Sequence, residues 1–232
     1  MKILLTGYEG FIGRNLEKAL RLEHEVLQYY GDIRYFACSH DVDLVIHLAA
    51  MTGVRSSWDN PDEYWDVNVT ASKRIFDWCE SKGVRVLYAS SSSVHEWWLN
   101  PYAMSKKAME ELAPADSVGM RFHTVYGDDS RPDMFYDMLL NDKIEYLTEH
   151  SRDFTHIEDL ISAVKILIAN PQVKGTIDIG TGKSVKVIDV AARFGKGPFY
   201  VKSSTPGERR HTKADLKILR SLGFKPTHNI LD

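Results

Sequence analysis

The sequence has few cysteines, no long apolar run and no strong excess of charge. Its 232 residues include only Cys38 and Cys79, which form no CxxC pair, so a disulfide framework is excluded and a reduced, cytoplasmic setting is expected. No apolar stretch approaches the roughly 20 residues that a membrane helix needs, and the first residues lack a signal-peptide pattern. A net charge of −3 gives no overall basic surface, so no nucleic-acid partner is expected.

Histidine spacing and local charge narrow the possible sites. The nine histidines include no HxxxH or HExxH arrangement, so no metal site is predicted. His47 lies in an apolar run and is interpreted as a core histidine with satisfied hydrogen bonds. Between residues 190 and 232, nine basic residues accompany three acidic ones. This excess favours either a solvated helix face or a local site for an anion such as a diphosphate.

The chain does contain an alternation of apolar strand-like runs and helical patterns. Strands are predicted at 2–6, 25–28, 44–48, 84–89 and 118–122, and helices at 11–22, 61–82 and 102–112. This order predicts an α/β fold, a doubly wound parallel sheet of the Rossmann type. Glycine and proline are more frequent after Gly127, which indicates a small, shortened C-terminal substrate lobe. The predicted domains are 1–127 with 152–178, and 128–151 with 179–232.

Three glycines lie between the first strand and an amphipathic helix. Gly7, Gly10 and Gly13 allow a tight turn and close approach of a pyrophosphate, which then lies at the helix N-terminus. An acidic residue that binds the adenosine ribose is expected about 20 positions later. The candidate is Asp32, with an ordinary turn residue as the alternative. NAD is the predicted cofactor. NADP is the alternative, because Arg34 can bind a 2′-phosphate.

A tyrosine and a lysine in the middle of the chain have the spacing of a proton-transfer pair. Tyr102 and Lys106 are four positions apart and share a helix face. A free tyrosine has a pKa near 10 and is a poor base, but a nearby ammonium lowers that pKa. A serine run, 90–93, follows the preceding strand and supplies hydroxyls for the same substrate oxygen. These groups predict redox chemistry on an alcohol or ketone.

An ordered series of segments resembles the extended short-chain dehydrogenase/reductase family, and within it the NAD-dependent nucleotide-sugar epimerases and dehydratases. The segments are TGYEGFIG (6–13), IHLAA (46–50), NPDEYWDVNV (60–69), YASSSSVH (88–95), PYAMSK (101–106), RFHTVYG (121–127), RPDM (131–134), RDFTHIEDL (152–160) and PGERRHTKAD (206–215). The series is most similar to UDP-glucuronate and UDP-galactose 4-epimerases.

The resemblance implies a role for individual residues. As catalytic residues it implies Ser91, Tyr102 as the base, and Lys106. As residues that bind NAD it implies Gly7, Gly10, Phe11, Ile12, Gly13, Asp32, Ile33, Leu48, Ala49, Ala50, Asn68, Tyr102, Lys106 and Val125. As residues that bind a nucleotide-diphospho-sugar it implies Ser91, Ser92, Thr124, Arg152 and Arg209. It also implies a homodimer.

The residues after Ser91 select among the reactions of this family. Dehydratases and decarboxylating relatives carry acids where this chain has Ser92 and Ser93, and a hydroxyl cannot replace a carboxylate in acid–base chemistry. Epimerisation, with C4 as the expected centre, therefore remains, through a transient 4-keto intermediate. The alternatives are an NADP-dependent 4-keto nucleotide-sugar reductase and a dinucleotide-binding relative without turnover.

Parts of the chain depart from the family pattern. The segment between the second strand and Asp32 is short, and so is the loop between Ser93 and Tyr102. Trp97 and Trp98 in that loop are interpreted as an apolar plug, with a substrate platform or an intersubunit contact as the alternatives. Three further tryptophans are predicted to pack within helices: Trp58, Trp65 and Trp78.

Overall fold

The computed structural model describes residues 1–232 and divides into two compact units. Unit 1 comprises residues 1–121 and 169–177, and unit 2 comprises 122–168 and 178–232. The predicted division differs, because it assigned 122–127 and 152–168 to the first domain. In the structure these segments hold β6 (Thr124–Tyr126) and β9 (Phe154–His156), which pair in parallel. Their side chains also pack into the core of unit 2, so the segments stay with that unit.

Unit 1 is built on a six-stranded sheet with the order β10-β5-β4-β3-β1-β2. Its strands are β1 (Lys2–Thr6), β2 (Glu25–Gln28), β3 (Leu44–His47), β4 (Arg85–Ser91), β5 (Val118–Phe122) and β10 (Gly175–Ile179), the last belonging to unit 1 as far as Ile177. β1 pairs in parallel with β2 and β3, and β3 with β4. The sheet is therefore Rossmann-like, as predicted.

The short segment after β2 changes the sheet order. Only the 3-10 turn η1 (Ile33–Tyr35) lies between β2 and β3. A dinucleotide-binding sheet of order 3-2-1-4-5-6 has another strand outside the second one. Here β2 is the edge strand, so the order around β1 is 2-1-3-4-5. The glycine loop after β1 still lies at the switch point, where neighbouring connections leave to opposite faces.

The helices of unit 1 follow the predicted pattern. They are α1 (Phe11–Leu20), α2 (Ser56–Asp59), α3 (Pro61–Trp65), the π-helical turn η2 (Asp66–Ala71), α4 (Ser72–Lys82), the 3-10 segment η3 (Ser92–Leu99) and α5 (Pro101–Glu111). From α3 to α4 the chain is one continuous helical stretch. It ends at Gly83, whose φ of 64° gives the left-handed cap that glycine favours.

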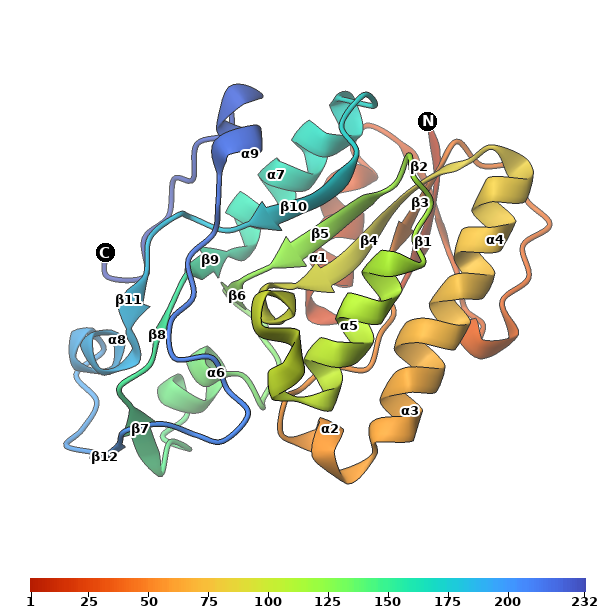
Figure 1. Ribbon diagram of the computed structural model, residues 1–232. Helices are drawn as coiled ribbons and strands as arrows, with labels where there is room; N and C mark the ends of the chain where they lie inside the picture. The colour runs from red at the N-terminus through yellow and green to blue at the C-terminus, as the bar shows by residue number, and fades with distance from the viewer. The chain divides into compact units, whose positions relative to one another are not determined.

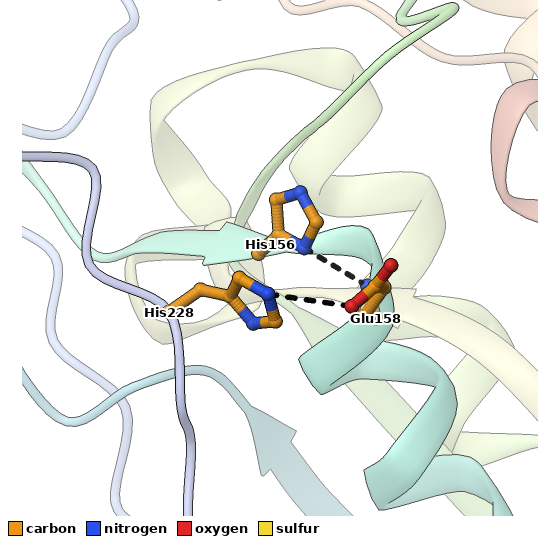
Figure 2. Close-up of side chains that lie close together, drawn as sticks. All are labelled: His156, Glu158 and His228. Atoms are coloured by element: carbon orange, nitrogen blue, oxygen red, sulfur yellow. Dashed lines mark hydrogen bonds and ion pairs between the residues drawn. The ribbon is translucent and has the colours of Figure 1, made fainter. Parts of the chain in front are cut away.

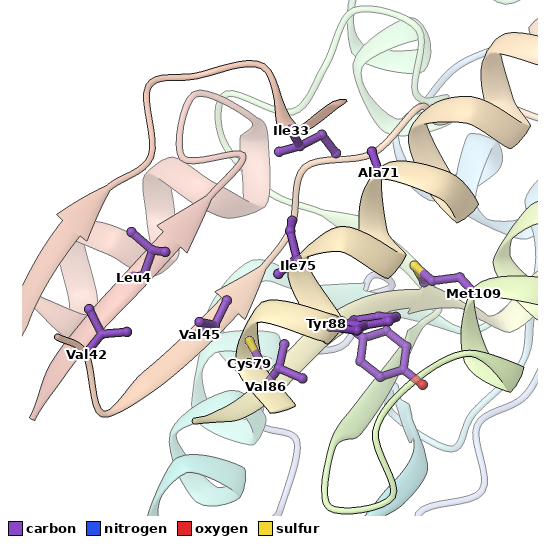
Figure 3. Packing of buried hydrophobic residues seen from close by; sticks show 11 residues of the cluster. Leu4, Ile33, Val42, Val45, Ala71, Ile75, Cys79, Val86, Tyr88 and Met109 are labelled. Atoms are coloured by element: carbon purple, nitrogen blue, oxygen red, sulfur yellow. The ribbon is translucent and has the colours of Figure 1, made fainter. Parts of the chain in front are cut away.

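The core of unit 1 lies between the sheet and two of these helices. Figure 1 shows α4 and α5 on one side of the sheet and α1 on the other. In Figure 3, Val45 and Val86 of the sheet lie against Ile75 and Cys79 of α4, and Met109 of α5 joins the same cluster. Each fully buried aliphatic side chain stabilises the fold by about 1.5–3 kcal/mol.

Unit 2 has short strands, four helices and a core of its own. Besides β6 and β9 its elements are β7 (Tyr146–Thr148), β8 (Ser151–Arg152), β11 (Val185–Lys186), β12 (Tyr200–Lys202), α6 (Phe135–Leu140), α7 (Ile157–Ala169), α8 (Val187–Arg193) and α9 (Lys217–Ser221). The strands form three two-stranded pairs, β6–β9, β7–β12 and β8–β11. No helix of the chain is long and apolar enough to cross a lipid bilayer.

Candidate active site

The glycine loop has the shape that a pyrophosphate requires. Gly7 has a φ of +69°, and a Cβ there would lie 2.5 Å from the nitrogen of Ala49. A Cβ at Gly13 would lie 2.1 Å from the oxygen of Gly7, so only glycine fits either position. Gly10 begins α1, whose first turn carries neither a side-chain cap nor an acidic residue. The residues therefore fit the phosphates of a dinucleotide at this helix N-terminus.

The end of β3 lies beside this loop. Leu48 and Ala49 donate hydrogen bonds to the backbone oxygen and the hydroxyl of Thr6, at 3.2 Å each. His47 is hydrogen-bonded to Thr6 through Nδ1 at 2.8 Å and to Ser72 through Nε2 at 2.9 Å. Burial lowers the pKa of His47 to about 3, so the ring is neutral. The interpretation of His47 as a satisfied core histidine is confirmed.

Asp32 is held by its own neighbour. Its carboxylate accepts a hydrogen bond from the backbone N–H of Arg34 at 2.9 Å and pairs with the Arg34 guanidinium at 2.6 Å. These hydrogen bonds from Arg34 lower the pKa of Asp32. Gln28 ends β2 opposite Leu5 of β1, and its amide donates to Glu17 Oε1 at 2.7 Å. No carboxylate therefore lies at the last position of the second strand.

The predicted proton-transfer residues lie on α5. The Asn100 side chain caps the helix by accepting a hydrogen bond from Ala103 N at 2.7 Å, so α5 begins immediately before Tyr102. Lys106 is one turn further on and only 2% exposed, and its Nζ donates to the Ala89 oxygen of β4 at 2.8 Å. Burial lowers the pKa of Lys106 to about 7, and the nearby Glu110 partly opposes this shift.

Glu110 joins α5 to two strands and was not found by sequence reasoning. Its carboxylate accepts from the Ser90 hydroxyl of β4 at 2.6 Å. It also accepts two bonds from the Arg121 guanidinium of β5, at 2.9 and 2.7 Å. The signal in the sequence is its position four residues after Lys106 on the same helix. This network fixes the helix face that carries Lys106 against the end of β4.

Ser91 is the last residue of β4, and Tyr102 lies in the first turn of α5. Ser91 is buried, and its hydroxyl accepts a hydrogen bond from Ser93 N at 3.1 Å. The Tyr102 ring packs edge-to-face against Tyr64 with 6.2 Å between centroids. The structure therefore brings together the end of β4 and the first turns of α5, the two segments that carry the predicted catalytic residues.

Asn68 lies in the π-helical turn η2 and is fully buried. Its amide exchanges hydrogen bonds with the backbone of Met51 at 2.8 and 3.0 Å, and donates to the Ser105 hydroxyl at 3.0 Å. Ser105 in turn donates to the backbone oxygen of Tyr102 at 2.8 Å. A π-turn is rare and frequently marks a functional site. Here it places Asn68 directly against α5.

Three predicted substrate residues, Thr124, Arg152 and Arg209, lie in unit 2 together with Val125 of the predicted NAD site, and Ser92 begins η3 in unit 1. Thr124 and Val125 are on β6, and Thr124 N donates to the Asp153 oxygen at 3.0 Å. Arg152 of β8 pairs with Glu208 at 3.2 Å. Burial lowers the pKa of Arg152, and the nearby Arg209 adds to this lowering. Arg152 and Arg209 thus form one positively charged corner of unit 2.

The tryptophans require a correction. Trp58 and Trp65 are 57% and 47% exposed, so the prediction that they pack within helices is wrong for both. The helices here are amphipathic, and these two rings lie on the solvent side. Trp78 does pack, and its indole N–H donates to the Cys38 oxygen at 3.2 Å. Trp97 and Trp98 form an edge-to-face pair, and neither ring is buried.

Comparison with known sequences gives one family. Residues 3–180 match the model of the NAD dependent epimerase/dehydratase family. A relative from Bacillus subtilis described as the uncharacterized UDP-glucose epimerase YtcB is 28% identical, and the alignment covers 100% of this chain and 95% of the relative. Protein CapI of Staphylococcus aureus is 30% identical over 74% of this chain and 70% of the relative.

Solved structures agree with this match. MoeE5 in complex with UDP-glucuronic acid and NAD is 31% identical, with a TM-score of 0.88 over 100% of this chain and 95% of that one. The UDP-glucuronic acid 4-epimerase of Bacillus cereus, in complex with UDP-glucuronic acid and NAD, is 26% identical, with a TM-score of 0.88 over 100% of this chain and 96% of that one. The chain belongs to the NAD dependent epimerase/dehydratase family, within the extended short-chain dehydrogenases/reductases.

Proposed function

We propose that the chain catalyses the C4 epimerisation of a nucleotide-diphospho-sugar, with UDP-glucuronate as the first substrate to test. The observation that carries this proposal is Tyr102 at the start of α5, one turn before the buried Lys106. The similarity to the UDP-glucuronic acid 4-epimerase of Bacillus cereus supports the choice of sugar.

The cofactor is held by the residues around the glycine loop. Gly7, Gly10 and Gly13 hold the pyrophosphate, and Asp32 with Ile33 receives the adenosine end. The other residues of the cofactor site are Leu48, Ala49, Ala50, Asn68 and Val125. Bound NAD supplies a reversible hydride acceptor for the sugar carbon.

The chain's own residues move the proton. Tyr102 takes the proton from the C4 hydroxyl and returns it to the 4-keto oxygen after the sugar has turned. The Lys106 ammonium lowers the pKa of the Tyr102 phenol through the attraction of opposite charges. The Ser91 hydroxyl donates to the same substrate oxygen and fixes its position. Ser92 carries no carboxylate and so cannot promote loss of water or of carbon dioxide.

Two arginines of unit 2 are assigned to the diphosphate of the substrate. Arg152 and Arg209 bind the diphosphate, because hydrogen bonds between guanidinium and phosphate are charge-assisted. Arg152 is held in place by Glu208, which limits the side-chain entropy lost on binding. Thr124 lies on β6 and contributes a further hydroxyl to the substrate side.

The test is interconversion of UDP-glucuronate and its C4 epimer, followed by NMR without added reductant. The Tyr102→Phe variant should lose turnover by at least about 100-fold while NAD binding, measured by calorimetry, remains. Tyr200→Phe is the matched control, because Tyr200 is exposed and is not among the proposed site residues. Near-normal turnover of Tyr102→Phe contradicts the assignment, and turnover that consumes NADPH stoichiometrically indicates the reductase instead.

We further infer a cytoplasmic homodimer that acts on small molecules rather than nucleic acid. Both cysteines are free thiols, which supports a reducing compartment. Relatives of this family often pair the helices around 61–80 and 102–112, and exposed apolar side chains occur on both stretches here, with Trp65 on α3 and Met104 on α5. Sedimentation equilibrium should give twice the chain mass, and Trp65→Glu should give the monomer. A wild-type monomer overturns this inference.

A further inference from the structure

Three side chains from distant parts of the sequence converge in unit 2. His156 ends β9, Glu158 lies in the first turn of α7, and His228 belongs to the C-terminal segment (Figure 2). One potential ligand atom from each lies within 4.8 Å of the others. Around a tetrahedral zinc ion with bonds of about 2.0–2.2 Å, ligand atoms are about 3.3 Å apart. The three groups therefore reach ligand distance with shifts of an ångström or so.

His228 is oriented by a buried carboxylate. Its Nδ1 lies 3.3 Å from Asp159 Oδ1, and its Nε2 lies 3.3 Å from Glu158 Oε2. Asp159 is itself fixed, because it also accepts hydrogen bonds from the backbone N–H groups of Thr227 and His228, at 2.9 and 3.0 Å. A carboxylate behind a histidine, with the second ring nitrogen facing the ligand position, is the usual outer partner of a metal-bound histidine.

His156 lies against the first turn of α7. Its Nδ1 accepts a long hydrogen bond from Glu158 N at 3.4 Å, which a metal ion bound at this nitrogen would replace. The His156 and His228 rings stack with 4.1 Å between centroids and 24° between planes. In Figure 2 both rings lie next to the Glu158 side chain. Both imidazoles therefore lie beside the same carboxylate, and the rings would tilt out of their stack to direct one nitrogen each at a common ion.

Two carboxylates and an opening to solvent suit a cation. The carboxylates of Glu158 and Asp159 would balance the charge of a divalent ion. A cavity of about 460 Å³ opens at His228 and gives a path from solvent. Its other lining residues include Lys183, Arg220 and Lys225, which offer no ligand atom to a cation. These basic groups favour water or a small anion in the remaining ligand position.

We propose that His156, Glu158 and His228 bind one divalent transition-metal ion of the zinc type. Two imidazoles and one carboxylate form a ligand set that zinc uses in proteins, with one open position. The ion would link the C-terminal segment to the start of α7 and stabilise unit 2. The expectation of no metal site rested on histidine spacing, which cannot detect ligands that are 72 positions apart, from 156 to 228.

The test uses the untagged full chain after chelation and dialysis. Calorimetric titration with ZnCl₂ should give one site per chain, and CoCl₂ should give the visible d–d bands of a four-coordinate ion. Bound zinc should also raise Tm. Glu158→Gln and His228→Asn should each weaken zinc binding at least about tenfold, and His40→Asn, an exposed histidine elsewhere, should not.

Two results overturn the proposal. One is the absence of saturable binding of zinc or cobalt by the folded wild-type chain. The other is binding that is unchanged in Glu158→Gln, whose side chain is 70% exposed and is replaced without disturbing the core. Epimerase activity is not a readout of either experiment, so failure here leaves the proposed function standing.

Discussion

Within unit 1, the Lys106 end of the predicted NAD site is buried and joined to the sheet by several hydrogen bonds, whereas the Asp32 end is exposed and held by one local ion pair. Lys106 bonds to β4, and the nearby Glu110 bonds to β4 and β5. Asp32 and Arg34 have side chains 39% and 43% exposed and contact each other. The Lys106 end thus depends on long-range packing, and the Asp32 end depends on a local turn.

The difference follows from the sheet. β3, β4 and β5 have neighbouring strands on both sides, whereas β2 is an edge strand and is followed in the chain by the short turn η1. A buried polar group costs 1–3 kcal/mol when its partner is removed, and an exposed ion pair contributes little. Substitutions at the two ends should therefore differ sharply in effect.

The largest effect is expected at Lys106. Lys106→Met removes the ammonium that stabilises the Tyr102 phenolate, so kcat should fall by roughly 10²–10⁴. The measurement is UDP-sugar interconversion with saturating NAD. Lys107→Met, on the exposed side of the same helix, is the control and should keep its activity. A fall of only a few-fold would mean that the buried end has no greater chemical role than the exposed one.

The same residue should make stability depend on pH. The folded-state pKa of about 7 lies below the ordinary 10.5, so between these values the folded chain binds fewer protons than the unfolded chain. Stability therefore rises with pH in that window, and the burial penalty is fully present below pH 7. Relative to Lys106→Met, the wild type should gain roughly 3–5 kcal/mol from pH 7 to 10. Urea unfolding of both chains measures this gain, and parallel pH curves would refute it.

The glycine loop offers a comparison within one turn of chain. A Cβ at position 13 would meet the Gly7 oxygen at 2.1 Å, whereas at position 10 the nearest atom is the same oxygen at 3.4 Å. Gly13→Ala should cost about 1–3 kcal/mol and abolish NAD binding, and Gly10→Ala should have the smaller effect on both. Thermal melts with and without NAD provide the measurement. Equal effects would show that the close approach at Gly13 is not what the loop requires.

The sequence predicts elements well where the signal is local. The strands at 2–6, 25–28 and 118–122 and the helix at 102–112 agree with the structure to within a residue or two. Each depends on an apolar run, a capping residue or a proline within a few positions. The fixed spacing of Tyr102 and Lys106 on one helix is a property of the same local kind.

Features that depend on distant contacts were not predictable in the same way. The unit boundary near residue 122 follows from the pairing of β6 with β9, which no local pattern announces. The π-turn places the Asn68 amide in hydrogen bonds with Met51 and Ser105, which are 17 and 37 positions away in the sequence. The convergence of His156 with His228 likewise requires the fold of unit 2.

The smallest effect is expected at Asp32, and it tests the exposed end directly. Asp32→Ala breaks the pair with Arg34 but removes no buried contact, so Tm should change little. NAD affinity should fall by about 2- to 10-fold, while kcat at saturating NAD stays near the wild-type value. Asp41→Ala, an exposed acid in the same connection, is the control. Unchanged affinity would remove Asp32 from the cofactor site. A fall in kcat at saturating NAD as large as that of Lys106→Met would mean that the exposed turn contributes to the chemistry as much as the buried network does. Only a residue needed for the chemistry itself lowers kcat when the cofactor is saturating.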